Sequence, residues 1–141
     1  MDAADRYGPA RSGRLWLVVG GVLAVAALAL LPWTVYLTLT LPSRSVTDHW
    51  DFVWVGFDLW LAAALMATAV GVLRRATWVS SAAVMAGTLL ACDVWFDILL
   101  EQPGRKFQAA VLQAVVAELP LAAVCFWIAY RNGAARRGQP R

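Results

Sequence analysis

Long stretches without basic residues dominate this sequence and limit what the chain can fold into. Between Arg14 and Arg44 no side chain is ionisable at neutral pH, and three later stretches of similar length carry at most two acidic residues each. A helix needs about 20 mainly apolar residues to cross a bilayer. The sequence therefore predicts four transmembrane helices, at about residues 15–41, 52–73, 77–100 and 107–130.

The composition agrees with this interpretation. Of the 141 residues, 61% are hydrophobic and 15% are Asp, Glu, Lys or Arg, whereas soluble proteins have roughly 45–50% and 25%. A globule of this size cannot hide so much apolar surface from water. The sequence argues against a soluble enzyme, a disordered tail and a disulfide-stapled secreted module. It predicts an all-α integral membrane four-helix bundle.

The connections divide the chain further. A single helix from Phe52 to Leu100 would run roughly 70 Å, so we expect a tight turn near residues 74–76, while Pro103 and Gly104 mark another turn. A cleaved signal peptide is the alternative for the first span, but the apolar run far exceeds the usual 7–15 residues. We expect a basic segment at residues 1–14, the four-helix domain at 15–130 and a basic tail at 131–141.

Basic residues are distributed unevenly between the two sides of the predicted bundle. Arg44, Arg105 and Lys106 lie on one side. The other side has nine: Arg6, Arg11, Arg14, Arg74, Arg75, Arg131, Arg136, Arg137 and Arg141. The positive-inside rule then predicts that both termini are cytoplasmic and that the chain is a multi-pass protein of the plasma membrane. The net charge of +3 comes from these flanks, and no nucleic-acid-binding motif is present.

Acidic residues inside the predicted spans are the main candidates for function. Four occur there, with no basic residue: Asp58, Asp93, Asp97 and Glu118. Each charged acid at the bilayer centre costs roughly 2.5–3.5 kcal/mol, so protonation, cationic side chains or a bound cation must compensate. Asp51 lies seven residues before Asp58 and shares its helix face. We expect these acids to converge on one proton- or cation-binding pocket in the outer half of the bundle.

Aromatic residues gather at the same level of the chain. Trp54, Phe57, Trp95 and Phe96 either belong to an interfacial aromatic belt or wall the pocket. Aromatic faces beside carboxylates suit an organic cation or a carbocation. His49 is a lone loop histidine that, with Asp51, is a weaker candidate for a metal ligand. No motif identifies a cofactor.

Several strings carry a resemblance to a known family. They are Leu31-Pro32-Trp33-Thr34-Val35-Tyr36, His49-Trp50-Asp51, Trp54-Val55-Gly56-Phe57-Asp58, Cys92-Asp93-Val94-Trp95-Phe96-Asp97 and Glu118-Leu119-Pro120-Leu121. With these strings the chain resembles a family of small four-span actinobacterial membrane proteins without an established molecular function. The resemblance covers nearly the whole chain except the tails and implies the fold and the origin. The small multidrug-resistance transporters are similar in size, but their key Glu lies in the first span, which has no acid here.

Two functional hypotheses follow from the acids. The first is a carrier or partner subunit that binds a proton, a metal ion or an organic cation at Asp51, Asp58, Asp93, Asp97 and Glu118. The second is an intramembrane enzyme in which Asp93 or Glu118 serves as the acid for acid/base chemistry on a lipidic, isoprenoid-like substrate. A purely structural role is the third interpretation. The expected partners are the lipid bilayer, the small cation or lipidic ligand, and a second copy or a membrane partner.

Overall fold

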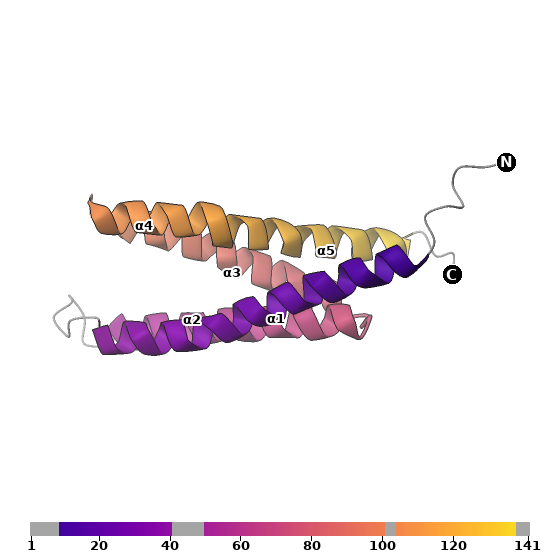
Figure 1. Ribbon diagram of the computed structural model, residues 1–141, viewed down its shortest axis with the longest axis horizontal. Helices are drawn as coiled ribbons and strands as arrows, with labels where there is room; N and C mark the ends of the chain where they lie inside the picture. The colour runs from indigo at the N-terminus through magenta and orange to yellow at the C-terminus, as the bar shows by residue number, and fades with distance from the viewer. Residues whose placement is uncertain (1–8, 41–49, 101–103, 138–141) are drawn as a thin grey trace.

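The computed structural model describes residues 9–40, 50–100 and 104–137, and the described chain is helical apart from its turns. Its elements are α1 (Pro9–Thr40), α2 (Trp50–Leu73), α3 (Val79–Leu100), α4 (Arg105–Gln113), the π-helical turn η2 (Ala114–Glu118) and α5 (Leu119–Arg137). Figure 1 shows α4, η2 and α5 as one continuous rod. Four stretches of the described residues are long and apolar enough to cross a membrane: Gly13–Tyr36, Val53–Leu73, Val79–Leu100 and Ala110–Ala134. The chain is therefore an all-α, four-helix, multi-pass membrane protein, as the sequence predicts.

The helices pack in a fixed order. α2 contacts α1 on one side and α3 on the other, and α3 in turn contacts α5. Figure 1 shows that the start of α1, the turn between α2 and α3 and the end of α5 lie at one end of the molecule. We call this the terminal end, and the opposite end the loop end. At the terminal end Trp16 of α1 stacks on Trp127 of α5, with ring centroids 5.4 Å apart.

Small side chains allow these helices to approach closely. The buried core consists of Leu23, Ala27, Leu61, Ala64, Leu65, Ala69, Val72, Val79, Ala83, Ala86, Leu90, Ala122, Cys125 and Ile128. Alanine is the most frequent residue in this set, which is typical of helix contacts in membranes. Large apolar side chains such as Leu17, Val25 and Trp60 are more than 60% exposed on the outer faces. A membrane protein presents such side chains to lipid.

The turn between α2 and α3 has an unusual residue at its centre. The N–H of Ala76 donates to the carbonyl of Gly71 (2.9 Å) and that of Arg75 donates to the carbonyl of Val72 (3.2 Å). This pair of bonds is the Schellman arrangement that ends a helix, in which the left-handed position is usually glycine. Arg75 holds that position with φ 51°, at a cost of roughly 1–2 kcal/mol for a residue with a Cβ. The turn lies where the sequence predicts it.

The fourth span, which the sequence predicts at about residues 107–130, is not a uniform α-helix. It begins in α4, widens at η2 and continues in α5 to Arg137. In the wide turn the N–H of Leu119 donates to the carbonyl of Ala114, five residues earlier. Pro120 follows directly and has no N–H to offer to the carbonyl of Val116. The missing bond and the widened turn thus occur together, beside Glu118.

Candidate functional site

Asp58 of α2 lies in the interior of the bundle, 5% exposed. Its Oδ2 is 3.0 Å from Oγ1 of Thr34 on α1. The same hydroxyl oxygen is 2.8 Å from the carbonyl oxygen of Leu30, one turn earlier in α1. The hydroxyl of Thr34 thus lies between a backbone acceptor and a carboxyl group of the neighbouring helix.

Glu118 is the last residue of η2 and is also 5% exposed. The amide Nε2 of Gln113 donates a hydrogen bond to its Oε1 at 2.9 Å. Its Oε2 atom is buried and has no hydrogen-bond partner among the described residues. The second oxygen of this carboxyl group therefore has no donor to stabilise a negative charge, which favours a proton on the group.

Asp93 of α3 is the third buried acid and interacts with both of the others. It is 8% exposed, and its carboxyl group interacts electrostatically with those of Glu118, Asp97 and Asp58. Glu118 interacts in the same way with Asp97 and Asp58. Asp93 and Glu118 thus each interact with the other three acids, and the four acids come from three helices. We call Asp58, Asp93, Asp97 and Glu118 the acid cluster.

The acid cluster has little positive compensation from the described chain. Nowhere in residues 9–40, 50–100 and 104–137 does an ion pair join Asp58, Asp93 or Glu118 to a basic side chain. Asp97 is half-buried and has an interaction of its own. The polar neighbours of the buried acids are instead one hydroxyl, from Thr34, and one amide, from Gln113.

Three of the four aromatic residues expected at the site form a contiguous group. Trp54 and Phe57 of α2 contact each other and Phe96 of α3 edge to face, with ring centroids 6.2–6.4 Å apart. The fourth, Trp95, is 64% exposed. We call this group the aromatic trio. It joins α2 to α3, and in the sequence Phe57 precedes Asp58 and Phe96 precedes Asp97. Trp95 instead lies on the outer face of α3.

The remaining predicted site residues are only partly described. His49 lies outside the described residues, and Asp51 belongs to α2 but its side chain is not described. Across the described ranges no group of three or more His, Cys, Asp or Glu side chains is arranged to hold a metal ion. The acids of the cluster interact through space without forming such a ligand set.

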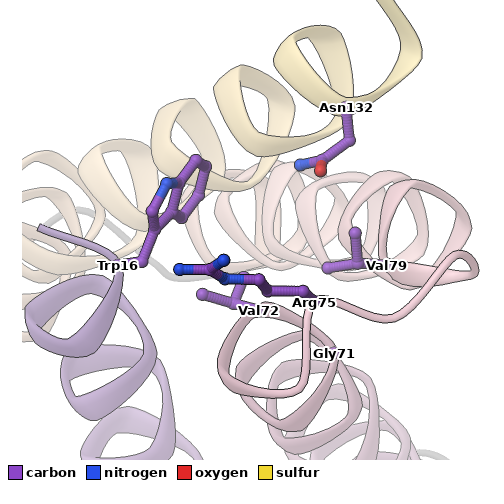
Figure 2. Close-up of a pocket in the computed structure, with 6 residues that line it drawn as sticks. All are labelled: Trp16, Gly71, Val72, Arg75, Val79 and Asn132. Carbon is purple, nitrogen blue, oxygen red and sulfur yellow. The ribbon is translucent and has the colours of Figure 1, made fainter. Parts of the chain in front are cut away.

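Sequence reasoning missed two residues of the site and one cavity. A threonine within a helix commonly bonds the carbonyl one turn earlier, so the sequence does not connect Thr34 with Asp58, and it gives Gln113 no role. It also gave no role to a cavity of about 210 Å³ at the terminal end (Figure 2). That cavity is lined by Trp16, Gly71, Val72, Arg75, Val79 and Asn132 and includes none of the acid cluster.

Comparison of the chain with protein-family models, with curated proteins and with solved structures finds no match. The resemblance to the actinobacterial four-span family therefore stays a prediction. The geometry of the chain itself is the basis for its function.

Proposed function

We propose that this protein is a small membrane carrier, or a subunit of one, that takes up and releases protons at the acid cluster. The observation that supports the proposal is the burial of three acids from three helices, Asp58, Asp93 and Glu118, of which Asp93 and Glu118 interact electrostatically with every other acid of the cluster. Like charges at such range oppose one another, so adding a proton or a cation to one group changes the affinity of the others. Ionisable groups inside spans commonly mark proton or ion pathways.

The hydroxyl of Thr34 supports a role for protons in particular. It has one hydrogen and lies within hydrogen-bond distance of two oxygens, the carbonyl of Leu30 and Oδ2 of Asp58. When Asp58 is charged, the hydroxyl can donate to the carboxylate. When Asp58 is neutral, its O–H can donate to Thr34 Oγ1 while that hydroxyl turns to Leu30. The contact is therefore compatible with both protonation states without a change of backbone.

The unpartnered Oε2 of Glu118 also supports proton binding at the acid cluster. Burying a charged carboxyl oxygen without a hydrogen-bond donor lowers stability. No donor to Oε2 is present among the described residues, so the neutral, protonated form of Glu118 is favoured. We propose that protons exchange between Glu118 and Asp93, with Asp97, less buried, as the group that connects the cluster to the loop end.

An organic cation is the second candidate ligand, because of the aromatic trio. Edge-to-face rings from two helices, with Phe57 and Phe96 each adjacent in the sequence to an acid of the cluster, suit a ligand that needs both an apolar wall and a counter-charge. A carrier that exchanges such a cation for protons would use the acid cluster for both. The trio is the feature that distinguishes this function from simple proton conduction.

The orientation belongs to the same proposal. The excess of basic residues at the terminal end favours a cytoplasmic location for both termini. The loop end, with the predicted proton entry, then faces the outside of the plasma membrane. Reporter fusions at the C-terminus and after residue 45 test this orientation, and an external C-terminus would overturn it.

Reconstituted vesicles provide the functional test. The full chain is inserted into liposomes that contain a pH-sensitive dye, and internal acidification is followed after an imposed pH step, with and without tetraphenylphosphonium inside. We expect acidification above that of empty vesicles, and at least a tenfold smaller rate in Asp93→Asn and Glu118→Gln. If only the rate with tetraphenylphosphonium exceeds that of empty vesicles, coupled exchange of an organic cation is the function.

Asp5→Asn is the matched control, because it removes one carboxyl group from the segment before the first span. It should leave the rate unchanged. Infrared difference spectra of the same samples at two pH values report carboxyl groups that change protonation state. Equal rates in the wild type, Asp93→Asn and Glu118→Gln, together with unchanged infrared carboxyl bands, would refute the proposal.

A further inference from the structure

The cavity at the terminal end is built by three separate parts of the chain. Trp16 enters from α1, Arg75 from the turn between α2 and α3, and Asn132 from α5, while Gly71, Val72 and Val79 form the apolar remainder. Figure 2 shows the Arg75 side chain reaching across the cavity toward Trp16, with the Asn132 carboxamide turned in from the opposite wall. The volume of about 210 Å³ exceeds by more than tenfold the roughly 10–15 Å³ that one water needs.

The polar groups that face this cavity are mainly hydrogen-bond donors. Throughout the described part of the chain, no hydrogen bond or ion pair uses the guanidinium of Arg75 or the indole N–H of Trp16. The Nδ2 of Asn132 donates one hydrogen bond to the carbonyl of Ile128 (2.8 Å), and it has a second hydrogen that can donate to a ligand. The guanidinium of Arg75 and the amide of Asn132, beside the ring of Trp16, are donors of the kind that bind an anion.

The chain supplies few anions of its own near this end. Of its nine acidic residues, only Asp2 and Asp5 belong to the sequence segments that flank the terminal end, against nine arginines. One of these arginines, Arg131, already lies over the ring of Trp127 (5.2 Å to the centroid), the ring that stacks on Trp16. The side of the cavity formed by α1 and α5 is thus itself electropositive.

The backbone at Arg75 is a second, independent observation. This residue holds the left-handed position of the turn, where glycine is the ordinary choice. An arginine there keeps a less favourable backbone conformation and directs its side chain into the cavity (Figure 2). Strained backbone conformations of this kind are concentrated at functional sites such as ligand-binding positions.

We propose that this cavity binds a phosphate group, held by the Arg75 guanidinium and the Asn132 amide beside the ring of Trp16. The lining residues lie at one end of all four candidate spans, Gly13–Tyr36, Val53–Leu73, Val79–Leu100 and Ala110–Ala134. That is the level at which lipid phosphates meet a membrane protein, and basic pockets between helices bind such headgroups. The same donors accept a free phosphate ion from solution. This site does not depend on proton binding by the acid cluster.

The test measures phosphate binding to the full chain purified in phosphate-free detergent. Native mass spectrometry counts bound phosphatidylglycerol, and titration calorimetry measures the affinity for inorganic phosphate. The key variant is Arg75→Gly, because it removes the guanidinium and at the same time relieves the left-handed backbone. Its fold should be at least as stable as that of the wild type. Arg74→Gln is the control, since it removes an exposed charge from the same turn without touching the cavity.

We expect Arg75→Gly to weaken phosphate binding about tenfold to a hundredfold, the loss typical of a hydrogen bond to a charged group. Arg74→Gln should change it less than threefold. A loss confined to phosphatidylglycerol identifies the source as a lipid headgroup, and a loss for inorganic phosphate identifies a soluble ion. Binding that is equal in the wild type and Arg75→Gly, or that falls as far in Arg74→Gln, would overturn the proposal.

Discussion

The amide of Gln113 donates to the carboxyl group of Glu118 at 2.9 Å, although the two residues are five positions apart on one continuous rod. In a regular α-helix, residues at that separation point about 140° apart around the axis. The π-helical turn Ala114–Glu118 reduces the rotation per residue and brings the two side chains to the same face. A local widening of the helix therefore creates the contact that anchors Glu118.

This relationship predicts a specific pattern of stability. Gln113→Leu leaves both oxygens of Glu118 without a donor from the described chain, and we expect it to lower the free energy of unfolding by about 1–3 kcal/mol. The double variant Gln113→Leu with Glu118→Leu should be more stable than Gln113→Leu alone, because no unpaired carboxyl group remains. Denaturant unfolding in mild detergent measures both. Strictly additive losses would mean that the contact does not exist in solution.

The sequence predicts the four helices well and the partners of the acids poorly, for one physical reason. Span positions depend on the hydropathy of 20 or more residues together, so a single side chain hardly matters. The partner of Glu118 depends on where one helix turn widens, and α-helical periodicity places Gln113 on another face. The partner of Asp58 is equally hard to predict, because a helical threonine such as Thr34 is expected to bond the carbonyl one turn before it, and Thr34 contacts that carbonyl as well as Asp58.

Thr34 provides the second prediction. Thr34→Val keeps the shape of the side chain and removes the only hydroxyl that joins α1 to Asp58 among the described contacts. We expect a loss of about 0.5–2 kcal/mol in the free energy of unfolding. Thr88→Val is a matched control, since the Thr88 hydroxyl also donates to the carbonyl four residues earlier but is exposed. A shift of the same size in both variants would show that the Asp58 contact contributes nothing.

Ser80 carries a buried hydroxyl oxygen with no hydrogen-bond partner in the described part of the chain. A buried polar group without a partner costs about 1–3 kcal/mol, so Ser80→Ala should leave the stability unchanged or increase it by up to that amount. Ser81→Ala, one residue further on the exposed face of α3, should have no effect. Thermal unfolding followed by tryptophan fluorescence compares them. A clear destabilisation by Ser80→Ala alone would mean that the hydroxyl is bonded after all.

The cavity at the terminal end shows a different limit of sequence reasoning. The residues that line it come from α1, α2, the turn, α3 and α5, and their meeting depends on the packing order of the helices. The sequence places Arg75 in a turn and counts it as one of nine basic residues on that side. Its left-handed backbone and the direction of its side chain are properties of the folded turn, which composition and periodicity do not contain.

Two glycines of α2 give the last prediction, because they differ only in what surrounds them. A Cβ on Gly71 would lie 3.0 Å from Cγ2 and 3.1 Å from Cβ of Val79, a β-branched residue that is itself 3% exposed. A Cβ on Gly56 would meet nothing within 4 Å. Gly71→Ala therefore forces α2 and α3 apart at the turn, and overpacking of this kind costs about 1–3 kcal/mol.

Gly56→Ala should instead be neutral or stabilise the helix by up to about 1 kcal/mol, because alanine loses less backbone entropy than glycine. Hydrogen exchange of the turn amides of Arg75 and Ala76 gives a local readout. Exchange at both amides should be faster in Gly71→Ala and unchanged in Gly56→Ala, since their acceptors are the carbonyls of Val72 and Gly71. If both variants leave the turn equally protected, α3 does not pack against α2 as closely at Gly71 as the structure places it.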